Sequence, residues 1–359
     1  MRAVLLRKPG PPQSLVVEDV PDPTPGPGEV LIKVHAAGVN FTDVLSRQGL
    51  NPEAAKPPFI LGHEVSGEVI ALGPGVGASA GGNGAHGSAT GGRGLEVGHR
   101  GLEVGQRVVA YHMSGGYAEK VAVPAEQVFP IADNLAHQCA VVLPLNYGTA
   151  YIALYRTGAV EPGMRVFIHA AAGGVGMAAV DLCRREGLEM TGGAGTHLKR
   201  SRLIVEGVKH VVQSRHLSIH RLSKRIYGDR GYDIVLDSVG GPTINDGLRA
   251  LRPGGRVVTL GVGGISGGGL LGAIRYLARV PRMTFIDLLK PSLGLYGVNM
   301  REMLANRPLM RKVLEELLSM AAAGEINPQP GRVMALAEAG AAHKLLQSRT
   351  NVGKIVLRV

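Results

Sequence analysis

The sequence predicts an α/β protein with two domains, one rich in β-strands and one built on a parallel sheet. Its 359 residues suit two domains better than one simple core. The first third consists of short apolar runs separated by turn residues, which is typical of an all-β or barrel-like domain. From about residue 126, short β-branched runs alternate with helical patterns, which indicates parallel strands joined by helices.

The strand-rich part begins at the N-terminus. Its first seven residues are too short for the core of a signal peptide and are predicted to be a strand. Further strands are predicted at residues 30–34, 65–71, 107–111 and 118–123. Residues 77–101 are crowded with Gly, Ala and Ser, so they offer little apolar surface to offset the entropy of ordering. We expect them to form a flexible surface loop.

The remaining strands and helices are predicted from the same change of pattern. Strands are expected at residues 165–169, 188–191, 210–213, 233–237, 256–260, 283–286 and 353–359. Helices are expected to begin after Gly176 and near Thr196, and another should cover residues 308–323 with Pro308 at its start. Strand 283–286 would be the last of the sheet, either paired with a second copy or covered by a helix at 270–278.

Composition excludes several classes of protein. The net charge is +11, but Trp is absent and aromatic residues make up only 4%, so no specific nucleic-acid partner is expected. The two cysteines, Cys139 and Cys183, cannot form a disulfide framework or a four-thiolate zinc site. No uninterrupted apolar run of about 18 residues occurs, so no transmembrane partner is expected. We therefore predict a cytoplasmic protein.

The most informative local pattern is a strand, a glycine-rich turn and a helix at residues 166–180. The dinucleotide-binding spacing G-x-G-x-x-G falls on Ala171, Gly173 and Gly176, with Ala at its first position. Glycines there let the backbone approach a pyrophosphate, and the helix N-terminus presents free N–H groups to it. The loop residues Gly173, Gly174, Val175 and Gly176 are therefore predicted to bind a dinucleotide.

The following strand indicates which dinucleotide. An acidic residue at its end would bind the ribose 2′-hydroxyl of NAD, but residues 190–198 contain no Asp or Glu. Thr196, Lys199 and Arg200 follow instead, and cationic side chains would pair with a 2′-phosphate. This favours NADPH, unless Lys199 and Arg200 are ordinary solvated residues at the start of a helix.

The chain resembles the zinc-independent medium-chain dehydrogenases/reductases of the quinone oxidoreductase type. Within that superfamily it is most similar to the vesicle amine transport protein group and to polyketide enoylreductases. The motifs run in family order across nearly the whole chain: GVNFTD at 38–43, GHEVSG at 62–67, VGQRV at 104–108, GGYAE at 115–119, NYGTAY at 146–151, the loop at 170–176, DSVGG at 237–241 and NVGK at 351–354.

The resemblance implies a Rossmann NADP-binding domain inserted in a mostly-β, partly open, GroES-like barrel. Residues 1–125 and 291–359 would form the catalytic domain, and residues 126–290 the Rossmann domain. NADPH and substrate would lie in the cleft between them, with Thr149 and Asn351 among the cofactor-binding residues. Relatives are commonly homodimers joined through an edge strand of the Rossmann domain, so a homodimer is expected here.

No metal is expected in the reaction. Zinc enzymes of the superfamily carry a cysteine ligand at the position of Asn40, and Asn is a poor zinc ligand. His63 and Glu64 of the G-H-E motif remain, but Cys139 and Cys183 do not match the other ligand position. His63 is then a cleft or packing residue.

Without a metal, the acceptor must take hydride without Lewis-acid activation, as a quinone or an α,β-unsaturated carbonyl does. Asn40 is predicted to donate a hydrogen bond to the carbonyl or developing oxyanion, or else to cap a turn. Tyr147 is predicted to donate a proton or line the pocket, or else to pack between domains; water is a competing donor. Two alternatives stay open: an enoyl-thioester reductase of polyketide or fatty-acid assembly, and a non-catalytic NADP-binding protein associated with lipid or RNA.

Overall fold

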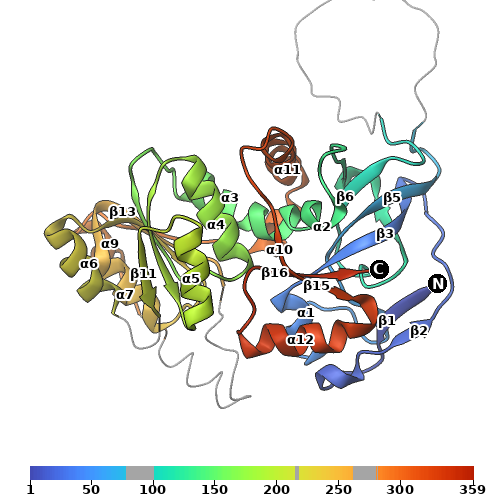
Figure 1. The fold of residues 1–359 in the computed structure, drawn as a ribbon, viewed down its shortest axis with the longest axis horizontal. Coiled ribbons are helices and arrows are strands. Elements are labelled where there is room, and N and C mark those ends of the chain that lie inside the picture. Colours follow the sequence, from blue (N-terminus) through green and yellow to red (C-terminus); the bar gives the residue numbers. More distant parts are fainter. Residues whose placement is uncertain (78–100, 215–217, 262–279, 281) are drawn as a thin grey trace, which may run out of the picture. The chain divides into compact units, whose positions relative to one another are not determined.

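The structure is a computed structural model that describes residues 1–77, 101–214, 218–261, 280 and 282–359 (Figure 1). Two compact units divide the chain. The first unit comprises Met1–Val141, Ala335–Gly340 and Leu357–Val359, and the second comprises Val142–Met334 and Ala341–Val356. The domain boundaries expected from the sequence stay a prediction.

The first unit is built mainly from antiparallel strands. One sheet has the order β2-β1-β4, and the other contains β3-β5-β6-β8 with β7 paired to β3. The strands are β1 (Arg2–Leu6), β2 (Val17–Asp19), β3 (Glu29–Val39), β4 (Phe59–Ile60), β5 (Glu64–Leu72), β6 (Arg107–Tyr111), β7 (Lys120–Pro124) and β8 (Val128–Pro130). The strands expected in this part of the sequence are confirmed, although β3 is longer than predicted.

Short helical segments connect these strands. They are η1 (Pro12–Ser14), α1 (Phe41–Arg47), η2 (Ala125–Gln127), α2 (His137–Ala140) and η7 (Leu336–Glu338). Helix α1 was not expected from the sequence, although its N-terminal signal is local. Asp43 accepts a hydrogen bond from the backbone N–H of Asn40 (2.8 Å), which is half of the reciprocal pattern that starts many helices.

The pairing of β3 with β5 contains an irregularity. Lys33 faces Glu68 and Val34 faces Gly67, but Ala36 faces Ser66, so His35 is an extra residue on β3. Such a bulge bends a strand and redirects a side chain. A Cβ atom on Gly67 would lie 1.9 Å from the carbonyl oxygen of Lys33, so only glycine lets the strands meet here.

Among its described residues, the second unit contains a parallel sheet of six strands in the order β11-β10-β9-β12-β13-β14. Its strands are β9 (Arg165–Ile168), β10 (Glu189–Ala194), β11 (His210–Gln213), β12 (Tyr232–Asp237), β13 (Leu251–Thr259) and β14 (Gly294–Gly297). The order reverses between β9 and β12, and the carboxyl ends of strands at such a point form the usual ligand crevice of open α/β sheets.

Helices cover both faces of this sheet, with α4 and α5 on one side and α6 and α7 on the other (Figure 1). Phe167, Tyr232 and Val257 of the sheet pack with Ile219 of α6 and Leu248 of α7 in one buried cluster. The described helices are η3 (Leu143–Tyr147), α3 (Gly148–Tyr151), η4 (Ile152–Thr157), α4 (Gly174–Arg185), α5 (His197–Val205), α6 (Ile219–Tyr227), η5 (Gly228–Arg230), α7 (Pro242–Ala250), α9 (Phe285–Leu289), α10 (Met300–Ala305), α11 (Arg307–Ala322) and α12 (Ala339–Ser348). Strands β15 (Pro330–Ala335) and β16 (Lys354–Arg358) are neighbours in one sheet.

One predicted strand is wrong. Residues 283–286 lead into helix α9, and the strand at the end of the parallel sheet is β14. Asp287 accepts hydrogen bonds from the backbone N–H (2.8 Å) and the hydroxyl (2.9 Å) of Thr284, which stabilises a helix start instead of an extended chain.

Two other expectations concern segments that the structure does not describe. The predicted loop at 77–101 and the predicted helix at 270–278 fall almost entirely outside the described residues. In the part of the chain that is described, no helix combines the length and apolar character needed to cross a membrane.

Candidate dinucleotide site and catalytic cluster

The glycine turn between β9 and α4 is packed too closely for side chains. Gly173 is the N-cap of α4, and α4 begins at Gly174. A Cβ atom on Gly176 would lie 2.4 Å from the carbonyl oxygen of Ala170, and one on Gly174 would lie 2.2 Å from Nδ2 of Asn146. A side chain at Gly176 would collide with backbone, whereas one at Gly174 would require the Asn146 side chain to move. The turn leaves the first N–H groups of a twelve-residue helix for a ligand.

A cavity of about 190 Å³ opens at the point where the strand order reverses. Its lining comes from the glycine turn and from the carboxyl ends of β9, β12 and β13, and includes His169, Leu236, Ser238 and Leu260. Burial lowers the pKa of His169, so the ring is neutral at neutral pH. Its buried Nε2 has no hydrogen-bond partner among the described residues. A cavity with a glycine wall and an unsatisfied polar atom fits part of a dinucleotide.

The end of β10 carries no acid. The strand ends at Ala194, Gly195 follows, and Thr196 is the N-cap of α5. The hydroxyl oxygen of Thr196 accepts a hydrogen bond from the backbone N–H of Lys199 (3.3 Å), and its carbonyl oxygen accepts one from the N–H of Arg200 (3.1 Å). The geometry therefore places these predicted residues together in the first turn of α5.

Lys199 reaches a segment far along the chain. Its Nζ donates a hydrogen bond to the carbonyl oxygen of Arg349 (2.7 Å), which is separated from it by 150 positions. Burial, and then the positive charge of Arg349, lower the pKa of Lys199. Two cationic residues thus lie where an NAD-binding site would carry a carboxylate. Arg349 was not among the residues predicted from the sequence, because no local pattern links it to α5.

The segment after Arg349 runs beside the glycine turn. The backbone N–H of Gly353 donates to the carbonyl oxygen of Ala172 (2.9 Å), and Gly353 bridges to Gly173. Asn351 is buried, and its Nδ2 donates to the carbonyl oxygen of Gly353 (2.9 Å). Asn351 therefore shapes a strand that borders the turn, which brings it close to the other predicted cofactor residues.

The side chains of the two predicted residues of the NYGTAY motif donate hydrogen bonds to other groups of the same chain. The hydroxyl of Thr149 donates to the carbonyl oxygen of Leu145 (2.5 Å), one helical turn before it. The hydroxyl of Tyr147 donates to Oδ2 of Asp181 (2.6 Å), and burial together with Asp181 raises the pKa of Tyr147. A tyrosine in this setting holds its proton tightly, so its proposed role as a proton donor stays a prediction.

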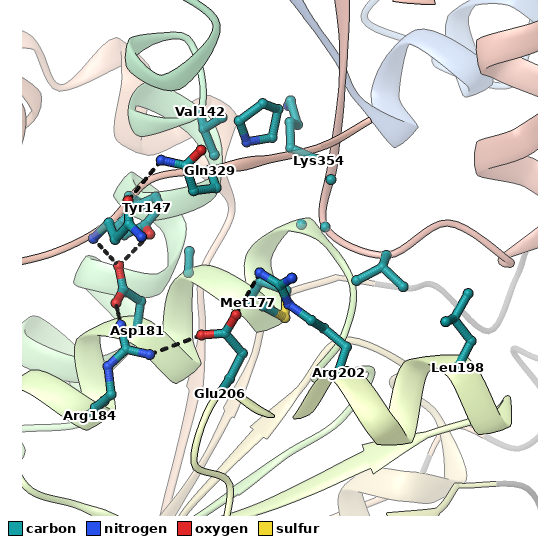
Figure 2. A pocket seen from close by; sticks show the side chains of 17 residues that line it. Val142, Tyr147, Met177, Asp181, Arg184, Leu198, Arg202, Glu206, Gln329 and Lys354 are labelled. Carbon is teal, nitrogen blue, oxygen red and sulfur yellow. Dashed lines mark hydrogen bonds and ion pairs between the residues drawn. The ribbon is translucent and has the colours of Figure 1, made fainter. Parts of the chain in front are cut away.

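Figure 2 shows where Tyr147 lies. It borders a cavity of about 280 Å³ lined by Gly174, Met177 and Asp181 of α4 and by Leu198 and Arg202 of α5. A chain of hydrogen bonds and ion pairs runs along one side of it, through Tyr147, Asp181, Arg184, Glu206 and Arg202 (Figure 2). Arg202 forms an ion pair with Glu206 (2.6 Å), so its guanidinium group is engaged with a protein carboxylate and is not assigned to a ligand phosphate.

In the first unit, the residues around Asn40 converge on a buried carboxylate. Asp43 accepts hydrogen bonds from the N–H of Asn40 (2.8 Å), the N–H of Gly62 (3.1 Å) and the hydroxyl of Tyr117 (3.1 Å). His63 Nε2 lies 3.4 Å from Oδ1 of the same carboxylate. Burial, and then Asp43, raise the pKa of Tyr117 well above its usual value.

Asn40 is the N-cap of α1, as one of its two predicted roles requires. Its Nδ2 donates to Oε1 of Glu64 (3.0 Å) and weakly to the carbonyl oxygen of Gly38 (3.4 Å). In its other predicted role, as a donor to substrate, Asn40 would exchange the weaker of these bonds for a hydrogen bond to the substrate oxygen. Nearby, burial lowers the pKa of His112 to about 4, so this ring is neutral.

Comparisons with known proteins place this geometry in a family. The profile described as "Alcohol dehydrogenase GroES-like domain" matches residues 26–133, and that described as "Zinc-binding dehydrogenase" matches residues 206–357. The human synaptic vesicle membrane protein VAT-1 homolog is 32% identical over 342 residues, which cover 93% of this chain and 80% of the human protein. The chain belongs to the medium-chain dehydrogenase/reductase family. That family is one of oxidoreductases, and both the predicted resemblance and the predicted fold class are confirmed.

Two other members bear on the choice of reaction. One polypeptide of the phenolphthiocerol/phthiocerol polyketide synthase of Mycobacterium tuberculosis is 32% identical over 352 residues, which are 98% of this chain but 14% of that polypeptide. The crystal structure of Escherichia coli quinone oxidoreductase complexed with NADPH matches with a TM-score of 0.82 and 25% identity, and the match covers 100% of both chains.

Proposed function

We propose that the protein is an NADPH-dependent reductase that transfers hydride to a quinone or an α,β-unsaturated carbonyl without using a metal. The observation that carries the proposal is the pairing of a sterically required glycine turn with Lys199 and Arg349 at the end of β10. The likeness to an oxidoreductase solved with NADPH supports the same cofactor.

The residues of the second unit fit NADPH in two places. Gly173, Gly174, Val175 and Gly176 would face the pyrophosphate at the N-terminus of α4. Thr196, Lys199, Arg200 and Arg349 would surround the 2′-phosphate, because a dianion relieves the repulsion between neighbouring cations. Asn351 would hold the bordering strand, and Thr149 is proposed to lie near the nicotinamide.

When bound, NADPH would supply a hydride ion from C4 of its nicotinamide ring. The chain's own contribution would be to bind the acceptor and stabilise the charge that develops on its oxygen. We assign that role to Nδ2 of Asn40, which Glu64 holds in place while the weaker bond to Gly38 is exchanged. Water is the simplest proton source, since the hydroxyl of Tyr147 is committed to Asp181.

Metal independence rests on the donor atoms around position 40. Asn40 stands where zinc enzymes of the family carry cysteine, and its Nδ2 is directed to Glu64. His63 Nε2 faces the buried carboxylate of Asp43. Among the described residues, His63 belongs to no group of three side chains spaced to hold a metal.

An enoyl thioester is the second candidate acceptor, and the polyketide synthase relative favours it. The chemistry is the same, because a thioester carbonyl conjugated to a double bond accepts hydride at its β-carbon. A non-catalytic NADP-binding role at a lipid surface is a third candidate, supported by the name of the vesicle membrane protein relative.

We further propose that the protein is a cytoplasmic homodimer.

The deciding experiment follows NADPH oxidation against a panel of quinones, enones and 2-enoyl thioesters. We expect turnover with at least one class and its loss in Gly176→Ala, because the added Cβ would lie 2.4 Å from the carbonyl oxygen of Ala170. Gly297→Ala is the matched control, because the added Cβ meets nothing closer than 4.0 Å. Tight NADPH binding with no turnover would favour the non-catalytic candidate, and no NADPH binding would contradict the proposal altogether.

A further inference from the structure

Three side chains of the first unit, outside the cluster around Asn40, have the composition of a metal site. They are His35 on β3, Glu68 on β5 and His137 at the start of α2. One ring nitrogen of each histidine and one carboxylate oxygen all lie within 4.8 Å of one another. The two imidazole rings stack with 4.7 Å between their centroids. Imidazole and carboxylate are ligands that Zn²⁺ and neighbouring first-row divalent ions accept.

His35 lies at the bulge in β3, close to Glu68. His35 is the extra residue between the pairs Val34–Gly67 and Ala36–Ser66, and Gly67 allows the close approach of the strands. Bulges redirect side chains and are frequent beside functional sites. The imidazole of His35 thus lies next to Glu68 at a locally irregular part of the sheet.

Ser66 fixes the tautomer of His137. The buried hydroxyl of Ser66 donates to the carbonyl oxygen of Val108 (2.7 Å), and a carbonyl cannot donate in return. The same hydroxyl oxygen lies 2.8 Å from Nδ1 of His137, so Nδ1 must carry the proton that it donates. Nε2 of His137 is then the bare nitrogen that can bind a cation. A hydrogen bond to the opposite nitrogen orients most histidine ligands of metals.

His35 offers a second ring nitrogen to the site. His35 Nε2 is buried and has no hydrogen-bond partner among the described residues. It lies 3.5 Å from Oε1 of Glu68, which is too far for an ordinary hydrogen bond.

We propose that His35, Glu68 and His137 bind one Zn²⁺ or a similar first-row divalent ion, with water completing the coordination. Donor atoms about 2.0–2.2 Å from one ion lie roughly 3–4 Å apart, so the side chains would close by about 1 Å. The side chains of Glu68 and His35 are partly exposed, so solvent reaches the site. The ion would link α2 to the bulge between β3 and β5. The proposed reductase chemistry at Asn40 does not use this ion.

The test is a metal titration of the full chain after treatment with a chelator and desalting. Co²⁺ is the first probe because its visible absorption reports coordination by nitrogen, and Zn²⁺ is then used in competition. We expect one ion per chain, with affinity at least tenfold weaker in His35→Gln, Glu68→Gln and His137→Gln. His210→Gln is the matched control, because His210 lies 3.8 Å from Glu189 but belongs to no group of three such side chains among the described residues.

Ser66→Ala tests the orienting hydrogen bond. We expect about tenfold weaker metal binding, the usual effect of losing such a partner. A purely structural Ser66 would instead lower the thermal midpoint without metal and leave the metal affinity unchanged. Stoichiometric binding that survives the double variant His35→Gln/His137→Gln would overturn the proposal. So would the absence of binding at about 1 mM Co²⁺ or Zn²⁺, where even a weak specific site is filled.

Discussion

The Nζ atom of Lys199 donates a hydrogen bond to the carbonyl oxygen of Arg349 across 150 positions of sequence (2.7 Å). This contact joins the first turn of α5 to the segment that borders the glycine turn. It also sets a cation where an acid would select NAD, and burial and Arg349 already lower the pKa of Lys199. A bound phosphate would favour the charged form of this lysine.

Cofactor preference follows from that contact. Lys199→Glu should weaken NADPH binding by about 1–3 kcal/mol, the scale of a charge-assisted hydrogen bond, because the carboxylate repels the 2′-phosphate. NADH binding should change much less, and both can be measured by fluorescence titration. Lys312→Glu is the control, since it makes the same charge change at an exposed position of α11. Equal affinities for NADPH and NADH in the unmodified protein would refute the preference.

Asn40 can be tested as the donor to the substrate oxygen. Asn40→Ser keeps a residue type that starts helices well but removes the amide donor. If Nδ2 stabilises the developing oxyanion, kcat should fall by roughly 10²–10³ while NADPH affinity holds, because the proposed role of Asn40 is to contact the acceptor and not the cofactor. Steady-state kinetics with the best acceptor of the panel would measure this. An unchanged kcat in a folded variant would leave Asn40 as a helix cap only.

Tyr147 should contribute to stability through Asp181. Tyr147→Phe removes the 2.6 Å hydrogen bond and leaves Oδ2 of Asp181 with the backbone N–H of Asn327 (2.7 Å). We expect the free energy of unfolding of the unit to fall by about 1–2 kcal/mol, measured by urea denaturation. Tyr296→Phe, at a half-exposed position of β14, should change it little. A loss no larger than that of the control would mean that the hydrogen bond is not formed in solution.

The sheet of the second unit was predictable because its signals are local. Short β-branched runs end at glycines and helix caps, so residues 210–213 match β11 and residues 256–260 overlap β13. The strand predicted at residues 283–286 is wrong because a four-residue apolar run is too short for its hydrophobic period to distinguish a strand from a helix. The spacing of Thr284 and Asp287, which favours a helix start, was the signal that decides it.

The candidate site could likewise be predicted only where its signals are local. The glycine turn and the missing acid after β10 are read from consecutive residues, and the structure assembles them as expected. Arg349 beside Lys199, Asp181 beside Tyr147, and Glu68 beside His35 are contacts between distant segments. Nothing in the local sequence indicates such pairs, since they depend on strand order and on a bulge that tertiary packing determines.

Metal removal separates the proposed reaction from the proposed metal site. Because Asn40, Glu64 and His63 are bonded to one another or to Asp43, we expect a chelator to leave NADPH-dependent turnover intact. The measurement compares rates before and after chelation and again after Zn²⁺ is added back. Turnover that is lost on chelation and restored by Zn²⁺ in His137→Gln would show that zinc acts at His63, contrary to the proposal.

The last prediction concerns dimerisation, and the structure changes the strand at which we expect the interface. The expected edge at residues 283–286 is not a strand, and β14 is the strand that ends the parallel sheet. An uncovered edge offers unpaired backbone groups that a second copy can satisfy about a two-fold axis. Large apolar side chains lie exposed in this part of the chain, on α9 and β14: Phe285, Ile286, Leu289 and Tyr296. Exposed apolar groups of this size commonly mark an interface.

We therefore expect a homodimer that uses β14, about twice the 37.5 kDa of one chain, measured by light scattering at micromolar concentration. Tyr296→Lys should weaken it, because a lysine on an edge strand disfavours pairing with another strand. Val333→Lys is the control, since Val333 is an exposed apolar residue of a different strand, β15. A mass near that of one chain for the unmodified protein would contradict the dimer. A dimer that persists in Tyr296→Lys together with Phe285→Lys would place the interface elsewhere.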